Sequence, residues 1–214
     1  NKISTCHYER VGYSFIGWAT SSDGDVVYQA GSQITSVKQD RAITLYAKWE
    51  ANAYSVTFVA NSEEYYSYQA KYDQPFVLPT SNPLRTGYTF QGWGTHQITS
   101  DTTFDGTKIY YRNIGTAEDP MYEIATVTAG ASVEPNTFFE IIEYTDRQVS
   151  VDGIVLHAIF TRNGYSISFN TNGGTPVNTI SALYGAEIAK PQDPTRTGYN
   201  FVAWYTKDGT STGD

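Results

Sequence analysis

The residues that could carry chemistry in this chain are few and scattered. The chain has 214 residues, with three histidines, His7, His96 and His157, and a single cysteine, Cys6. Cys6 and His7 are adjacent and could supply two metal ligands, but their spacing matches no structural zinc pattern and a second pair of ligands is missing. A nucleophilic or thioester role for Cys6 would need a positioned base, which the sequence does not show. His157 is expected to be a solvent-facing residue of a strand.

Carboxylates are abundant, but their arrangement defines no catalytic site. The segments 23–25 (DGD) and 101–106 (DTTFDG) are rich in oxygen ligands, yet neither has the alternating acids and distant glutamate of an EF-hand loop. We interpret both as turns, with calcium binding as the alternative. Glu140 and Glu143 have no histidine, lysine or nucleophile arranged with them, and no nucleotide-binding or serine-hydrolase motif occurs. The sequence therefore predicts no enzyme, no metal and no cofactor.

The net charge of −8 is concentrated in one segment. Residues 97–153 contain ten acidic and three basic residues, whereas the rest of the chain has a net charge of −1. This balance argues against a nucleic-acid partner, because nonspecific binding relies on Lys and Arg to displace counterions. The apolar runs are too short for a transmembrane helix, and the N-terminal residues lack the apolar core of a signal peptide. We therefore expect no membrane insertion in this stretch.

One nine-residue pattern occurs three times and indicates architecture rather than catalysis. It reads RVGYSFIGW at residues 10–18, RTGYTFQGW at 85–93 and RTGYNFVAW at 196–204. An active site is normally built once, whereas a copied structural unit carries its core residues in every copy. The tyrosine and phenylalanine share one face of a strand, and a bulge at the small residue would bring the tryptophan to that face. The predicted repeat core is Tyr13, Phe15, Trp18, Tyr88, Phe90, Trp93, Tyr199, Phe201 and Trp204.

The other positions of this signature also suggest specific roles. The arginine could stack on a neighbouring aromatic ring. The glycine before the tyrosine is present in all three copies and suggests a special backbone conformation there. The residue before the tryptophan is Gly17, Gly92 or Ala203, so we expect that position to require small size more than positive φ.

Flanking strands recur at matching distances from the signature. The opening strands YSVTF and YSISF begin at Tyr54 and Tyr165, each 34 residues before a signature tyrosine. The closing strands at 43–49 (ITLYAKW) and 154–160 (IVLHAIF) alternate as expected for β strands with one buried face. Four residues separate each closing strand from the next opening strand.

One spacing differs and locates an insertion. The distance from the signature tryptophan to the end of the closing strand is 31 residues in one copy and 67 residues in another. The surplus of 36 residues falls within 97–153. The insertion contains strand-like segments at 121–128 and 138–144, so we expect it to add a hairpin or to enlarge the sheet.

The chain thus divides into three parts. We name residues 1–50, a partial module, the first copy; residues 51–161, a complete enlarged module, the middle copy; and residues 162–214, a second partial module, the third copy. The predicted fold class is mainly β (α+β), with at most one short helix or helical turn.

Three segments carry a resemblance to a known family. Residues 165–174 (YSISFNTNGG), 184–209 (YGAEIAKPQDPTRTGYNFVAWYTKDG) and 43–49 (ITLYAKW) resemble the Listeria-Bacteroides repeat, or internalin B-type B repeat, of bacterial surface proteins. The resemblance covers nearly the whole chain apart from the insertion. It implies small β-grasp-like modules in tandem at the bacterial cell surface, with no catalytic residues to carry over.

The expected function is therefore that of a noncatalytic extracellular stalk or adhesin segment. In the alternative, the enlarged middle copy recognises a host protein or glycan, or the chain assembles into a surface filament or layer through exposed strand edges. The tract EEYYSYQ at 63–69 could be a contact surface, or an edge strand with solvated tyrosines. Candidate partner-binding residues are Tyr65, Tyr66, Tyr68, Glu118, Asp119, Glu140 and Glu143.

Overall fold

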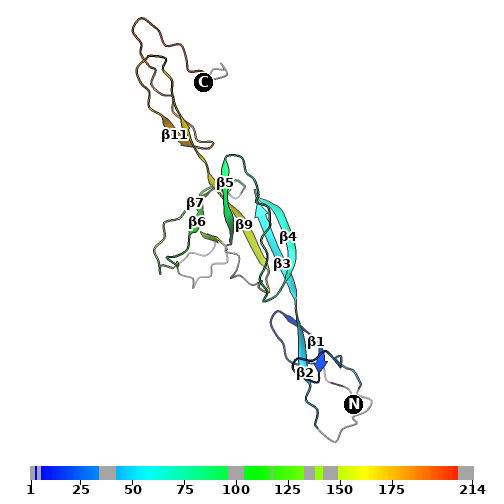
Figure 1. Cartoon of the computed structure of the whole chain (residues 1–214). Coiled ribbons are helices and arrows are strands. Elements are labelled where there is room, and N and C mark those ends of the chain that lie inside the picture. Colours follow the sequence, from blue (N-terminus) through cyan, green and yellow to red (C-terminus); the bar gives the residue numbers. More distant parts are fainter. Residues whose placement is uncertain are drawn as a thin grey trace. The chain divides into compact units, whose positions relative to one another are not determined.

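The computed structural model describes residues 3, 6–33, 42–95, 104–116, 118–132, 138–141 and 149–206 (Figure 1). Within these ranges the chain forms strands β1 to β11 and no helix, so the fold is mainly β, as the alternation of the sequence predicts. The chain forms two compact units, one of residues 1–84 with 90–160 and one of residues 85–89 with 161–214. The described residues include no helix that is long and apolar enough to cross a bilayer.

The first copy contains a two-stranded antiparallel sheet. Strand β1 (Tyr13–Ala19) pairs with β2 (Tyr46–Ala51), and the register shifts between Phe15 and Gly17. This irregularity is the bulge that the signature predicts, and it leaves Phe15 in edge contact with Trp18, with ring centroids 5.1 Å apart. At the small-residue position φ is 142° at Gly17 and 145° at Gly92 but is not positive at Ala203, so two copies use a conformation that favours glycine and the third does not.

A seven-stranded sheet forms most of the middle copy. Its order is β4-β3-β9-β5-β8-β6-β7, so the closing strand β9 lies between the opening strand β3 and the signature strand β5. Strand β3 pairs parallel with β9 and antiparallel with β4. The strands are β3 (Ala53–Ala60), β4 (Glu63–Lys71), β5 (Tyr88–Thr95), β6 (Tyr110–Asn113), β7 (Tyr122–Ile124), β8 (Phe138–Ile141) and β9 (Ile154–Arg162).

The core of the middle copy is built on one face of β9. Every second residue of that strand, from Ile154 to Phe160, is buried, as its alternating pattern predicts. Phe58 on β3 is fully buried and meets Trp93 with ring centroids 4.9 Å apart. Each buried aromatic side chain removes roughly 150–250 Å² from water, so these rings dominate the core.

The acidic segment 97–153 covers part of the other face of β9. Its strands β7 and β8 lie within the two segments that the sequence predicts as strands. Tyr111 on β6 and Tyr122 on β7 form a buried cluster with Ile159, which is 0% exposed. His157 is therefore half-buried rather than solvent-facing, and burial lowers the pKa of its imidazole from the ordinary 6.5. The expectation of a solvent-facing His157 was wrong, because the sequence pattern does not show which segment folds onto this face.

The third copy has a smaller ordered sheet. Strand β10 (Gly164–Ile167) pairs antiparallel with β11 (Ile180–Leu183). Trp204 packs on Phe169 and Phe201, with ring centroids 4.9 and 5.2 Å apart. In the third copy the signature residues Phe201 and Trp204 thus pack against Phe169, which belongs to the opening segment.

The half-buried His157 predicts a pH dependence for the middle copy. Because the native state holds this pKa below 6.5, the unfolded chain binds the proton more readily, and stability should fall as the pH drops below about 6.5. His157→Gln should remove that part of the decline. The measurement is the urea midpoint of the parent and the variant between pH 8 and pH 5, and parallel curves for the two proteins would contradict the prediction.

Candidate functional site at the repeat junctions

The first half of each signature folds into the same local turn. In every copy the arginine guanidinium lies over the tyrosine ring, and the tyrosine N–H donates to the arginine carbonyl. Such cation–π contacts contribute about 0.5–1 kcal/mol at exposed sites. The guanidinium carbon lies 3.8 Å from the ring centroid for Arg10 and Tyr13, 3.9 Å for Arg85 and Tyr88, and 4.0 Å for Arg196 and Tyr199.

The glycine inside this turn has nearly the same conformation in all copies. Its φ is 78° at Gly12, 80° at Gly87 and 79° at Gly198. This is the left-handed region, which glycine enters without the steric cost that a Cβ imposes. We call the Arg-x-Gly-Tyr segment with these contacts the docking turn.

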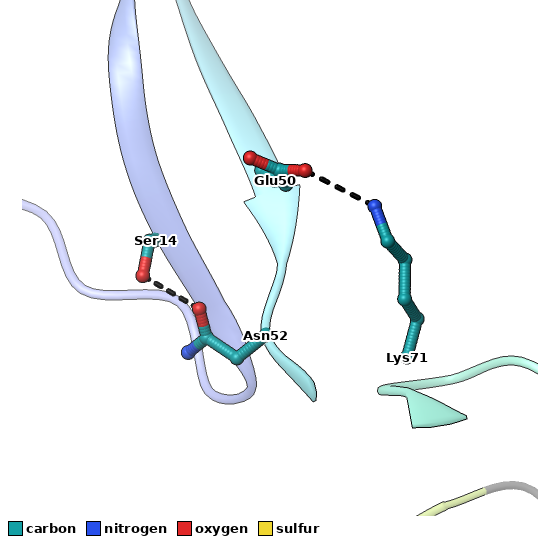
Figure 2. Close-up of polar contacts among 4 residues, drawn as sticks. All are labelled: Ser14, Glu50, Asn52 and Lys71. Carbon is teal, nitrogen blue, oxygen red and sulfur yellow. Dashed lines mark hydrogen bonds and ion pairs between the residues drawn. The ribbon is translucent and has the colours of Figure 1, made fainter. Parts of the chain in front are cut away.

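A single asparagine connects the first docking turn to the middle copy. The Asn52 N–H donates to the carbonyl of Gly12 at 2.9 Å, and the Asn52 carbonyl accepts from the Tyr72 N–H at 2.8 Å. The Ser14 hydroxyl donates to Asn52 Oδ1 at 2.6 Å (Figure 2). Asn52 therefore uses its backbone donor, its backbone acceptor and its side chain between the two copies.

An aromatic contact accompanies these hydrogen bonds. The Tyr72 ring lies edge-on to Tyr13, with centroids 5.6 Å apart, and near Tyr54 at 6.2 Å. It also covers Gly12, because a Cβ built there would lie 2.3 Å from atoms of the Tyr72 ring. An ion pair between Lys71 and Glu50, at 3.0 Å, also joins the two copies (Figure 2). It adds little stability, since both side chains are largely exposed.

The second unit repeats the same contacts with a different set of residues. The Asn163 N–H donates to the carbonyl of Gly87 at 2.9 Å, and the Asn163 carbonyl accepts from the Tyr184 N–H at 2.8 Å. The Thr89 hydroxyl donates to Asn163 Oδ1 at 2.6 Å. The Tyr184 ring lies 6.0 Å from that of Tyr88, and a Cβ at Gly87 would lie 2.1 Å from it. We call the docking turn together with this asparagine and tyrosine the junction.

The junction asparagines are not among the residues that the sequence motifs predict to be functional. A signal was available, because both four-residue linkers, Glu50–Ala53 and Thr161–Gly164, have asparagine in the third position. The hydroxyl residue that binds it follows the signature tyrosine in both cases. Asparagine is common in turns, so an asparagine in a linker does not by itself predict a contact between two copies.

The structure separates the residues of the predicted repeat core into two groups. Phenylalanine and tryptophan of the signature are in contact in every copy, with centroids 5.1, 5.5 and 5.2 Å apart along the chain. Trp93 is 3% exposed. The signature tyrosines lie instead in the docking turns, where Tyr13 and Tyr88 are half-buried and Tyr199 is 65% exposed.

The tyrosine tract of the middle copy lines a hollow on β4. Its walls are Tyr65, Tyr66, Tyr68 and residues 77–81. The Tyr65 hydroxyl is 2.8 Å from Ser81 Oγ, and the Tyr68 hydroxyl donates to the carbonyl of Val77 at 3.1 Å. Tyr66 is 48% exposed. Two of the three hydroxyls are thus engaged within the unit, and the Tyr66 ring stacks on Phe58 with centroids 6.1 Å apart while about half of the residue stays exposed.

The acidic partner-binding candidates lie in different places. Glu118 and Asp119 are exposed residues of the loop between β6 and β7. Glu140 lies in β8, where its backbone is opposite Thr95 and Tyr110, and Glu143 lies outside the described residues.

The residues considered for metal chemistry form no cluster in the described part of the chain. No three side chains of His, Cys, Asp and Glu gather there to hold an ion. Asp105 accepts from the Thr107 N–H at 2.9 Å and from its hydroxyl at 2.8 Å, and these bonds lower the pKa of the Asp105 carboxyl. This is an Asx turn, the interpretation that the sequence favours for 101–106. His96 lies outside the described residues.

Comparisons with known proteins agree with the repeats. The family profile described as the Listeria-Bacteroides repeat domain matches residues 2–48, 54–116 and 165–213. A protein of Evansella cellulosilytica that is named a Gly-rich membrane protein is 29% identical over 91% of this chain and 18% of its own length. A second one, named a membrane protein, is 28% identical over 92% of this chain and 23% of its own length.

A further relative is internalin H of Listeria monocytogenes. It is 29% identical over 59% of this chain and 16% of its own length. The chain therefore spans less than a quarter of each of these relatives. No solved structure matches.

The contact between Gly12 and Tyr72 predicts unequal effects of the same substitution. Gly12→Ala and Gly198→Ala both place a Cβ at φ near +79°, at a similar strain of about 1–2 kcal/mol. Only the Gly12 variant also drives a Cβ into the Tyr72 ring. Its melting temperature should fall further, and the Asn52 amide should exchange its hydrogen at least tenfold faster. Calorimetry and amide exchange measure both, and equal losses in the two variants would contradict the steric role of the ring.

Proposed function

Because the chain belongs to the Listeria-Bacteroides repeat family, we propose that it is a noncatalytic repeat segment of an extracellular protein at the bacterial cell surface. In this function the copies act as a stalk that holds other parts of the protein at a distance from the cell. Each complete copy is a small β-grasp-like module. The acidic insertion of the middle copy enlarges that module beyond the edge of its signature strand.

The observation that carries this proposal is the repetition of the junction. The same three hydrogen bonds and the same tyrosine contact occur at Gly12 and at Gly87, although most of the surrounding sequence differs. A four-residue linker alone would leave two modules free to reorient. Adding backbone hydrogen bonds and a covered glycine at each linker restricts that freedom, as a spacer requires.

A junction of this kind should make neighbouring copies tumble together. In the parent, backbone amides of β1 and β3 should have the same rotational correlation time in ¹⁵N relaxation. Tyr72→Ala removes the ring that covers Gly12, so the amides of β1 should then report a shorter correlation time than those of β3. Tyr46→Ala is the matched control, because Tyr46 is 40% exposed on β2 and is not one of the residues of the junction. Unequal correlation times already in the parent would reject the proposal.

A second candidate function is recognition of a protein or glycan by the middle copy. It is favoured by the hollow on β4, where Tyr66 presents an exposed ring, and by the exposed acids Glu118 and Asp119. Exposed tyrosines supply large contact area at low entropic cost. In this case the stalk would also act as an adhesin.

The recognition role predicts a loss of binding on truncation of Tyr66. Tyr66→Ala should weaken binding to a glycan array or to immobilised extracellular-matrix proteins by tenfold or more, as expected for an exposed aromatic anchor. Tyr46→Ala, also an exposed strand tyrosine, should bind like the parent. Equal binding by both variants, or no binding by the parent, would reject the recognition role of this hollow.

Assembly into a filament or layer is the remaining alternative. The exposed edge of β4 could pair with another chain. Light scattering distinguishes this case, since a chain that stays monomeric at high concentration does not polymerise.

A further inference from the structure

The docking turn of the third copy is not covered by any of the residues that the structure describes. No heavy atom of the described residues lies within 4 Å of the position that a Cβ at Gly198 would take, whereas Tyr72 and Tyr184 occupy that position at Gly12 and Gly87. Gly12 is buried and Gly198 is exposed. Tyr199 is 65% exposed, while Tyr13 and Tyr88 are half-buried. Among the described residues, an asparagine and a tyrosine thus contact the turns at Gly12 and Gly87 but not the turn at Gly198.

The uncovered turn already has the geometry of the occupied ones. Arg196 lies 4.0 Å from the Tyr199 centroid, the Tyr199 N–H donates to the Arg196 carbonyl at 3.0 Å, and φ of Gly198 is 79°. Because the turn forms without its partner, binding would cost little reorganisation. A preorganised surface of this kind is a binding site rather than a segment that orders on contact.

The residue after Tyr199 has suitable chemistry for the remaining hydrogen bond. Ser14 and Thr89 donate to the asparagine Oδ1 in the two junctions. The third copy has Asn200 at this position, and its side-chain amide also carries donors. The complete set of partner groups is thus present on residues 196–200.

We propose that residues 196–200 are the docking site for another repeat of the same kind, placed after the third copy. That repeat would supply an asparagine whose N–H donates to the Gly198 carbonyl and whose Oδ1 accepts from Asn200. It would also supply a tyrosine ring that covers Gly198 and meets Tyr199 edge-on. This inference rests on the proposed function, since it extends the junction of the stalk beyond the third copy.

A second copy of this chain fits the site less well. The asparagine and tyrosine pairs that the chain contains, Asn52 with Tyr72 and Asn163 with Tyr184, already cover Gly12 and Gly87. A second molecule would have to open one of its own junctions to supply either pair. A following repeat has no such cost, and the two Evansella relatives, of which the chain spans 18% and 23%, have length for further repeats.

The test extends the full chain with its own sequence. Tyr199 and Tyr13 are equivalent, so Asp214 corresponds to Tyr28, and residues 29–160 appended after Asp214 complete the third copy and add a second middle copy. The appended segment contains its own Asn52 and Tyr72. Hydroxyl-radical footprinting by mass spectrometry then measures the reactivity of Tyr199, which lies in a tryptic peptide between Arg196 and Lys207.

The matched control is an extension by residues 29–51 only. It adds the closing strand to the third copy but lacks Asn52 and Tyr72. Tyr199 should react at least threefold more slowly in the long extension than in this short one. Gly198→Val in the long extension should restore the reactivity, and Tyr72→Ala in the appended segment alone should do the same.

Several results would overturn the inference. One is equal Tyr199 reactivity in the two extensions while amide exchange shows that the appended repeat is folded. Another is protection of Tyr199 in the unextended chain that rises with protein concentration, which would assign the site to a second copy. If Tyr72→Ala uncouples β1 from β3 while Tyr199 stays reactive, the stalk function stands and the docking site at residues 196–200 does not.

Discussion

The contact between a glycine and the face of a tyrosine is the interaction on which the joined copies depend. At Gly12 the missing side chain serves two purposes. The backbone can adopt φ of 78°, and the ring of Tyr72 can lie where a Cβ would otherwise be. Any other residue would strain the backbone and push the ring away at the same time. The hydrogen bonds of Asn52 can form only while this close approach is kept.

The signature therefore serves two structural purposes in one short segment. Its arginine, glycine and tyrosine build a docking turn, while its phenylalanine and tryptophan, such as Phe90 and Trp93, pack in the core. The bulge before the tryptophan allows the docking turn and the core contact to be formed by neighbouring residues. Because the same nine residues hold the core and the junction, damage to the signature would affect the stability of a copy and its coupling to the next one together.

The acidic segment combines burial with surface charge in a similar way. Tyr111 and Tyr122 cover Ile159 on the outer face of the closing strand. The acids of this segment that the structure describes are exposed, namely Asp105, Glu118, Asp119, Glu123 and Asp152. Glu123 is paired across β6 and β7 with Arg112 at 2.8 Å. Its apolar residues thus pack into the middle copy, and the charge of its described acids is left on the surface.

The sequence by itself determined the mainly β class, the alternation of the closing strand, the bulge near Gly17 and the turn at Gly12, because these follow from local patterns and backbone sterics. Only the tertiary structure decided that Asn52 joins the copies, since its partners lie far along the chain. The same holds for the half-buried His157. A residue's pattern shows which face it occupies in a strand, but what lies against that face depends on which distant segment folds onto it.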